Sequence, residues 1–244
     1  MSLHVFVHAD LGQLRTGDEV ELTADEAKHA LVKRIRVGEQ ITVTDGAGVS
    51  ATCTVTAADK TSVAAQVDLI DVRHRETPHV VVVQAIPKGD RGELAVEMLT
   101  EVGVDVIVPW AASRSVAVWR EEKQAKALAR WRATAHAAAK QSRRAWFPEV
   151  RDMVGTDEVV ELLGDASVPV VLHESASGPL ADVPVPGRSE IVVVVGPEGG
   201  ISDEELEAFA AVGAEPVRLG SSVLRSSTAG VAAVAALLAR SRWR

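Results

Sequence analysis

The sequence predicts an α/β protein in which a small N-terminal β barrel precedes a larger domain built on a parallel sheet. Over roughly the first 72 residues, short runs of alternating apolar and polar residues are broken by turns, which is typical of strands with one buried face. Beyond residue 78, continuous β-branched runs alternate with helical stretches, which is typical of parallel strands joined by helices. We therefore place the domain boundary near residues 73–78 and predict domains at 1–73 and 74–244.

Strands and one helix make up the predicted N-terminal domain. The N-terminus lacks the basic start, apolar core and cleavage site of a secretion signal, so we expect a strand there. Further alternating runs cover residues 19–23, 41–44 and 52–56. Asp45-Gly46-Ala47-Gly48 supplies the turn between the last two runs. Thr23 and Glu26 have the spacing of a capping box, which predicts a helix over residues 27–36 that stops at Gly38.

The larger domain is predicted to be doubly wound, with helices on both sides of its sheet. Its predicted strands are residues 79–86, 104–110, 168–173, 191–195 and 215–219. Its predicted helices are residues 91–102, 120–142, 156–163, 203–212 and 228–240. A Ser202–Glu205 capping box opens the fourth helix. The last helix is apolar around more of its circumference than one core face requires, and we expect a second copy of the chain to cover it.

Composition excludes several classes of protein. Of the 244 residues, 47% are hydrophobic and 25% are charged, so the chain can bury a large core and is not a disordered tract. No run reaches the roughly 18 to 20 apolar residues of a membrane span, so we expect no membrane partner. Cys53 is the only cysteine, which excludes an internal disulfide and a cysteine-based zinc site. We expect no metal and a reducing, cytoplasmic setting.

Charge is unevenly distributed along the chain. Residues 113–146 contain nine Lys and Arg against two Glu, so this window carries +7. The rest of the chain must then carry −15 to give the net charge of −8. A basic face on an acidic body suits contacts with RNA phosphates, whereas the alternative is an ordinary solvated helix surface.

Three loops that follow predicted strands are the best candidates for a ligand site, because open parallel sheets bind ligands at the carboxyl ends of their strands. Gly196-Pro197-Glu198-Gly199-Gly200 allows a ligand to approach the backbone closely. Residues 219–228 contain the apolar pair Val223-Leu224, which could form a slot the size of adenine. The third loop is Leu172-His173-Glu174. Neither a dinucleotide fingerprint nor a P-loop sequence occurs.

Together these motifs resemble the RsmE family of SPOUT RNA methyltransferases. Gly-Pro-Glu-Gly-Gly is followed about twenty residues later by Leu-Gly-x-x-Val-Leu-Arg at residues 219–225 and by a Thr-Ala helix start. Four further segments fall in the family's order. They are residues 29–38 followed by Asp45-Gly46-Ala47-Gly48, Lys88-Gly89-Asp90-Arg91, Thr100-Glu101-Val102-Gly103-Val104 and Gln141-Ser142-x-Arg144. The resemblance covers essentially the whole chain.

The resemblance implies a fold, a reaction and partners. The implied fold is a PUA-like N-terminal β barrel followed by a SPOUT α/β domain with a parallel sheet, whose last segment forms a C-terminal trefoil knot, in a homodimer. The implied reaction is transfer of a methyl group from S-adenosyl-L-methionine to N3 of a uridine in the 16S rRNA of the 30S ribosomal subunit. The implied cofactor-binding residues are Leu172, His173, Glu174, Gly196, Glu198, Gly199, Gly200, Leu219, Gly220, Val223, Leu224 and Arg225.

RNA contacts are expected from basic residues in both domains, because phosphate contacts need only a basic face. These residues are Lys33, Arg34, Arg36, Arg91, Arg114, Arg143 and Arg144.

The chain departs from the family pattern at three places. Glu97-Met98-Leu99 replaces the usual segment before Thr-Glu, and Lys140 stands where Glu usually precedes Gln-Ser. Ser227 replaces the carboxylate of the usual Leu-Arg-x-Glu-Thr-Ala. These changes leave two other hypotheses open: an RNA-binding or ribosome-assembly module without turnover, and a methyltransferase for another RNA nucleotide.

Two residues are the candidates for catalysis. Methylation at N3 requires loss of the uracil N3 proton, which either a base or a fixed positive charge can promote. Arg225 is the candidate for the positive charge, and its alternative role is to anchor a phosphate or the cofactor carboxylate. Glu198 is the candidate base, and its alternative role is to orient the cofactor.

Overall fold

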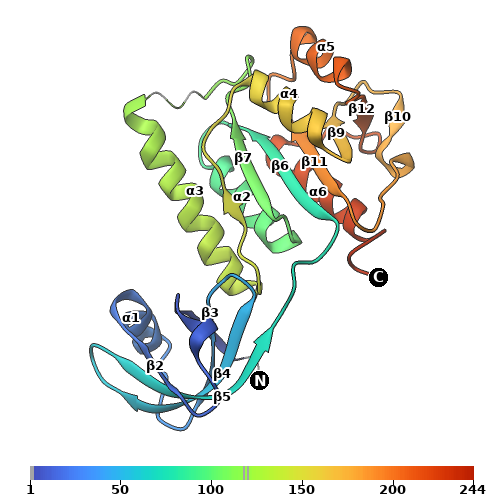
Figure 1. Cartoon of the computed structure of the whole chain (residues 1–244). Coiled ribbons are helices and arrows are strands. Elements are labelled where there is room, and N and C mark those ends of the chain that lie inside the picture. Colours follow the sequence, from blue (N-terminus) through green and yellow to red (C-terminus); the bar gives the residue numbers. More distant parts are fainter. Residues whose placement is uncertain (1–2, 118, 120) are drawn as a thin grey trace. The chain divides into compact units, whose positions relative to one another are not determined.

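The computed structural model describes residues 3–117, 119 and 121–244, and the chain divides into two compact units (Figure 1). The first unit comprises the chain up to Arg75 together with Ala139–Phe147. The second comprises Glu76–Ala138 and Pro148–Arg244. Residues 139–147 return to the first unit, which the sequence pattern does not predict. The proposed division at residues 73 and 74 stays a prediction.

A five-stranded sheet forms the first unit, in the order β1-β3-β4-β5-β2. The strands are β1 (His4–Val7), β2 (Glu19–Leu22), β3 (Gln40–Thr44), β4 (Val49–Ala58) and β5 (Val63–Val72). β1 pairs with β3 in parallel, and the other pairs are antiparallel. Alternate side chains point into one core, where Phe6, Ile41 and Cys53 are fully buried. Burial raises the pKa of the Cys53 thiol to about 11, so this cysteine is an inert part of the core.

The helix of the first unit, α1 (Ala24–Val32), begins and ends earlier than the sequence predicts. The predicted capping box is wrong, because the Thr23 side chain makes no capping bond and the Glu26 carboxylate accepts a hydrogen bond from Val7 N at 3.3 Å. Arg34, with φ of 57°, ends the helix ahead of Gly38. Two hydrogen bonds, Ile35 N to Ala30 O and Arg34 N to Leu31 O, complete a Schellman motif at this end.

Residues 139–147 belong to the first unit through a turn with two glycines. Gly48 N donates to Ala145 O at 2.9 Å, and Phe147 N donates to Gly46 O at 2.8 Å. A Cβ at Gly48 would lie 2.5 Å from the Trp146 ring, in a backbone with φ of +101°. The Asp45-Gly46-Ala47-Gly48 turn therefore serves close packing as well as chain reversal.

A seven-stranded parallel sheet forms the second unit, in the order β10-β12-β9-β11-β6-β7-β8. The strands are β6 (His79–Ala85), β7 (Val106–Trp110), β8 (Glu149–Val150), β9 (Val168–Leu172), β10 (Gly178–Pro179), β11 (Glu190–Val195) and β12 (Pro216–Arg218). The helices are α2 (Arg91–Val102), α3 (Glu121–Gln141), α4 (Thr156–Asp165), α5 (Asp203–Ala211) and α6 (Ser226–Leu238). The last residues of α3, from Ala139 on, belong to the first unit. Two short 3-10 helices, η1 (Leu11–Gln13) in the first unit and η2 (Leu180–Asp182) in the second, complete the elements.

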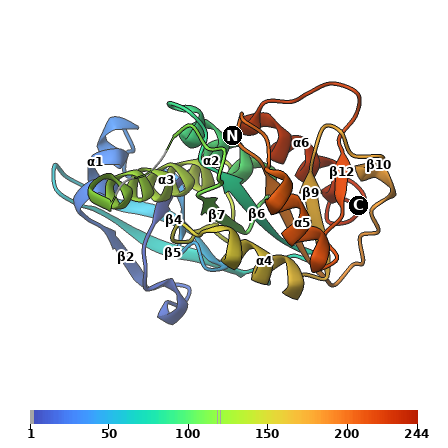
Figure 2. The same ribbon diagram turned by 90° about the horizontal axis from the view of Figure 1, so that it is seen from above.

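Helices cover both faces of this sheet, as the continuous β-branched runs predict (Figure 2). Val80 and Val82 of β6 pack on the face that α2, α3 and α6 cover. Val81 and Val83 pack on the opposite face, against α4 and α5. The fold class is thus confirmed, whereas the trefoil knot stays a prediction.

Element boundaries match the sequence prediction closely in this unit, with a few differences. The α5 capping box is confirmed, with Ser202 N to Glu205 Oε2 at 2.9 Å and Glu205 N to Ser202 Oγ at 3.2 Å. α6 begins two residues earlier than predicted, and its N-cap is Arg225. Arg120, the predicted start of the third helix, lies outside the described residues. Within the part of the chain that the structure describes, no helix has the length and apolarity needed to span a bilayer.

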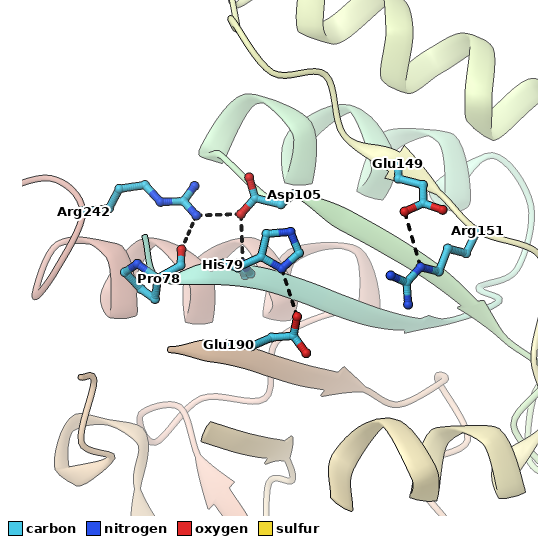
Figure 3. A network of polar contacts seen from close by, with 8 residues as sticks. Pro78, His79, Asp105, Glu149, Arg151, Glu190 and Arg242 are labelled. Atoms are coloured by element: carbon cyan, nitrogen blue, oxygen red, sulfur yellow. Dashed lines mark hydrogen bonds and ion pairs between the residues drawn. The ribbon is translucent and has the colours of Figure 1, made fainter. Parts of the chain in front are cut away.

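The C-terminal tail is fastened to the amino-end edge of the sheet by Arg242 (Figure 3). Its guanidinium donates to Asp105 Oδ2 at 2.6 Å, to Gly103 O at 2.8 Å and to Pro78 O. Asp105 Oδ2 also accepts from Val80 N at 2.9 Å. We call these contacts of Arg242 and Asp105 the C-terminal latch.

Candidate functional site

A pocket of about 340 Å³ opens at the carboxyl ends of β9, β11 and β12 in the second unit. This volume lies within the range of small-molecule sites. All three loops that the sequence singled out contribute to its wall. The lining residues are Arg91, Leu172, His173, Glu174, Val195, Gly196, Pro197, Glu198, Gly200, Ile201, Arg218, Leu219, Gly220, Ser221, Ser222, Val223, Leu224, Arg225, Ser226 and Ala229.

The glycines of the loop after β11 have different surroundings: some are closely packed and others face open space. A Cβ on Gly196 would lie 2.8 Å from Ile201 Cγ1, so this position is closely packed. Gly200, with φ of +76°, lines the pocket, and nothing would lie within 4 Å of a Cβ added there. Gly199 does not line the pocket, because it lies against the backbone of Arg114, where a Cβ would be 2.7 Å from the carbonyl oxygen.

The loop after β12 supplies the apolar part of the wall. Gly220 adopts φ of +75°, and nothing would lie within 4 Å of a Cβ added there. Val223 and Leu224 are exposed and line the pocket. With Leu172 and Leu219, they give a flat ligand an apolar surface.

The loop after β9 is held by one hydrogen bond to β12 and one within the loop. His173 N donates to Val217 O at 3.0 Å, and Ser175 N lies 3.3 Å from His173 Nδ1. This second contact uses Nδ1 as an acceptor. Glu174 beside it is exposed and lines the pocket.

A buried carboxylate braces the helix that follows the glycine loop. Glu205 is 4% exposed and accepts hydrogen bonds from Ser202 N, from Ser113 N at 2.8 Å and from Thr156 Oγ1 at 3.2 Å. It therefore joins the start of α5 to the segment that packs on Gly199. The Arg114 guanidinium adds a contact to Ile201 O at 3.3 Å.

The two candidate catalytic residues both lie on the pocket wall. Arg225 is exposed at the N-cap of α6, where its carbonyl accepts from Thr228 N and Ala229 N. Glu198 Oε1 accepts a hydrogen bond from Lys88 N at 3.3 Å, so its carboxylate ties the glycine loop to the segment before α2. That contact favours a positioning role for Glu198.

Two further arginines line the pocket. Arg91 lies in the wall at the start of α2, and its predicted RNA contact stays a prediction. Arg218 was missed, although its place at the end of β12 was a usable signal. Together with Arg225, they make the wall rich in positive charge.

Ser227 occupies a different environment from the pocket. It is 5% exposed in the first turn of α6 and does not line the wall, whereas its neighbour Ser226 does. The serine that replaces the family's carboxylate therefore does not contribute to the pocket wall.

The predicted RNA-binding residues of the first unit lie mostly on its surface. Lys33, Arg34 and Arg36 are exposed around the end of α1, and Arg143 is exposed with φ of 57°. Arg144 is half-buried. Whether these residues contact RNA stays a prediction.

Part of the basic window is neutralised locally. Arg130 pairs with Glu93 at 3.3 Å, and Arg132 pairs with Asp152 at 2.9 Å. Lys140 pairs with Glu26 at 2.5 Å. The net charge of the window therefore overstates the positive charge that remains for a ligand.

Comparison with known protein families identifies both parts of the chain. Residues 75–238 match the model of an RNA methyltransferase domain, and residues 22–68 match that of an RNA methyltransferase PUA domain. Ribosomal RNA small subunit methyltransferase E of Mycobacterium bovis is 42% identical over 93% of this chain and 89% of its own length. The protein of the same name from Bacillus subtilis is 29% identical over 95% and 94% of the two chains.

Solved structures agree with this relationship. The crystal structure of a ribosomal RNA small subunit methyltransferase E from Neisseria gonorrhoeae, bound to S-adenosyl methionine, superimposes with a TM-score of 0.89 at 30% identity and covers 98% of each chain. A structure from Legionella pneumophila in complex with bound SAM gives 0.88 at 28% identity, over 99% of each chain. The two domain matches and the full-length relatives show that this chain belongs to the ribosomal RNA small subunit methyltransferase E family.

Proposed function

We propose that this protein transfers the methyl group of S-adenosylmethionine to N3 of a uridine in the 16S rRNA of the small ribosomal subunit. The observation that carries the proposal is the convergence of three separate loops on one pocket at the carboxyl edge of the sheet. A relative of 30% identity, similar over 98% of each chain, was crystallised with S-adenosyl methionine. We expect the reaction to take place in the cytoplasm, where ribosomal subunits are made.

The pocket fits this cofactor in size and chemistry. Leu172, Leu219, Val223 and Leu224 offer apolar contacts for adenine, and the open backbone at Gly220 permits close approach. When bound, the cofactor supplies an electrophilic sulfonium methyl group. The arginines of the wall suit its carboxylate or an RNA phosphate.

Arg225 is the residue that we assign to the chemistry at N3. As uracil loses its N3 proton, negative charge spreads over the O2 and O4 carbonyls. A guanidinium stays protonated and presents several donors in a fixed fork, so it stabilises that anion without itself removing a proton. Ser227 does not weaken this assignment, because its position lies outside the pocket lining.

We further propose a homodimer in which α6 contributes to the interface. Leu94 is an exposed large hydrophobic residue of α2, the helix that packs against α6. A second copy of the chain would remove this side chain from water. Sedimentation at micromolar protein tests this, and the mass of a single chain would contradict it.

Methyl transfer itself is tested with labelled S-adenosylmethionine and 30S subunits from a strain that lacks the enzyme. We expect label in 16S rRNA and, after digestion, in 3-methyluridine. Label in another nucleoside would refute the N3 assignment. Cofactor and RNA binding without transfer would instead support a module that has lost turnover.

A further inference from the structure

One polar side chain in the second unit interrupts an otherwise apolar strand. Gln84 lies near the carboxyl end of β6 and is 0% exposed, opposite Val195 of β11. The four residues before it, Val80–Val83, are all buried valines. Because an unpaired buried amide is costly, a glutamine at this place calls for a specific partner.

That partner is the hydroxyl of Ser226. Gln84 Nε2 lies 2.9 Å from Ser226 Oγ and 3.0 Å from Ala85 O. Exchanging the amide oxygen and nitrogen would place the amide oxygen against the Ala85 carbonyl, and two acceptors repel each other. The amide nitrogen therefore faces both oxygens, and Gln84 donates to Ser226.

The direction of this bond determines what Ser226 can do. A hydroxyl has one hydrogen and two lone pairs, and Gln84 uses a lone pair. Among the residues that the structure describes, Gln84 is the one side chain that bonds Ser226 Oγ. As the first residue of α6, Ser226 has no preceding helical turn whose carbonyl could accept its hydrogen. Its O–H thus remains able to donate.

Ser226 lines the pocket beside Arg225, although it is only 8% exposed. We infer that Ser226 is a ligand-binding residue whose O–H donates to an acceptor atom of the cofactor, and that Gln84 is a positioning residue that holds the hydroxyl in this orientation. The inference rests on the proposed function, because it takes S-adenosylmethionine as the occupant of the pocket. The acceptor belongs either to the nucleoside or to the amino-acid carboxylate.

Three probes distinguish an acceptor atom in the nucleoside from one in the amino-acid carboxylate. They are S-adenosylmethionine, S-adenosylhomocysteine and 5′-methylthioadenosine, which lacks the amino-acid part. We expect Ser226→Ala to weaken the binding of S-adenosylmethionine and of S-adenosylhomocysteine about tenfold in calorimetry, as loss of one good hydrogen bond does. Weaker 5′-methylthioadenosine binding would assign the acceptor to the nucleoside. Unchanged 5′-methylthioadenosine binding would assign it to the carboxylate.

Gln84→Met tests the positioning role, because methionine keeps the length of the side chain and removes its amide. We expect it to weaken cofactor binding severalfold in the wild-type background. In the Ser226→Ala background it should have no further effect, whereas a general packing defect would act equally in both. Ser226→Thr keeps the hydroxyl and should restore most of the affinity.

Ser241→Ala is the matched control. Ser241 follows the same helix and donates to Leu237 O at 2.9 Å, and we expect this variant to bind like the wild type. If wild-type protein failed to bind S-adenosylmethionine, the proposed function would be wrong. If the wild type bound S-adenosylmethionine and Ser226→Ala bound it equally well, the inference on Ser226 would be overturned while the proposed function stood. The same holds if Ser226→Ala lost transfer rate without losing affinity.

Discussion

Replacing Arg242 with methionine should destabilise the second unit strongly while leaving its ligand pocket intact. In the C-terminal latch, the Arg242 side chain is 4% exposed and that of Asp105 is 9% exposed (Figure 3). Removal of one partner from such a buried pair costs about 3 to 5 kcal/mol, because the other charge stays buried. Asp105 retains the bond from Val80 N, so we expect the lower end of that range, about 3 kcal/mol.

Urea unfolding measures this loss. With a slope of about 2 kcal/mol per molar urea, a loss of about 3 kcal/mol lowers the midpoint of the second unit by about 1.5 M. The latch joins Pro78, Gly103 and Asp105 at the amino-end edge of the sheet, whereas the pocket opens at the carboxyl ends. In protein that remains folded, the dissociation constant for S-adenosylmethionine should therefore be unchanged.

Figure 3 also contains the matched control for this variant. Arg151 pairs with Glu149 at 3.5 Å, and the two side chains are 42% and 62% exposed. Exposed pairs of this kind contribute at most about 1 kcal/mol, so Arg151→Met should barely move the midpoint. Equal effects of Arg242→Met and Arg151→Met would refute the reasoning from burial.

Three other predictions concern the pocket and the first unit. Arg225→Ala and Arg225→Lys should lower the single-turnover methyl-transfer rate at saturating RNA and cofactor, with both dissociation constants nearly unchanged. If saturation with either ligand restored the rate, Arg225 would be a binding residue. Gly220→Asn should weaken cofactor binding in calorimetry with little loss of melting temperature. Gly199→Ala should instead lower the melting temperature, because its Cβ meets the Arg114 carbonyl. Loss of stability in Gly220→Asn and loss of binding alone in Gly199→Ala would contradict this assignment. Burial, and then the Lys140 charge, lower the pKa of His29 from its usual 6.5. As the pH falls, the unfolded chain therefore binds a proton at His29 before the folded chain does. The stability of the first unit should decline below about pH 6.5 for this reason. Urea midpoints from pH 5 to 8 measure this decline, and His29→Gln should reduce it.

Periodicity and strand-end position predicted most of the second unit. Runs of β-branched residues identify strands buried on both faces, and the rule that ligands bind at carboxyl ends led from three loops to one pocket. Neither inference needs knowledge of tertiary contacts. Gly199 shows the limit of this reasoning, because a glycine needed for packing and one needed for a ligand look alike in sequence.

The first unit was harder to predict because its local signals have tertiary uses. Glu26 stands at capping-box spacing, yet its carboxylate bonds Val7 N and Lys140. Arg34 ends α1 in a left-handed conformation that usually signals glycine. Gly46 and Gly48 were interpreted as a turn. Their lack of side chains also allows Phe147 and Trp146, about a hundred positions away, to pack closely against them.

Charge in the pocket favours stabilisation of an anion over removal of a proton by a side chain. Arg91, Arg218 and Arg225 line the wall, and of the two carboxylates there, Glu198 is engaged with Lys88 N. Ser227, which replaces the family's usual carboxylate, does not line the pocket. In the function proposed above, a positive wall would lower the cost of the uracil anion, and a weak base such as water could then accept the N3 proton. In that proposed mechanism, turnover needs no carboxylate at position 227, because Ser227 lies outside the pocket lining whereas the three arginines belong to it.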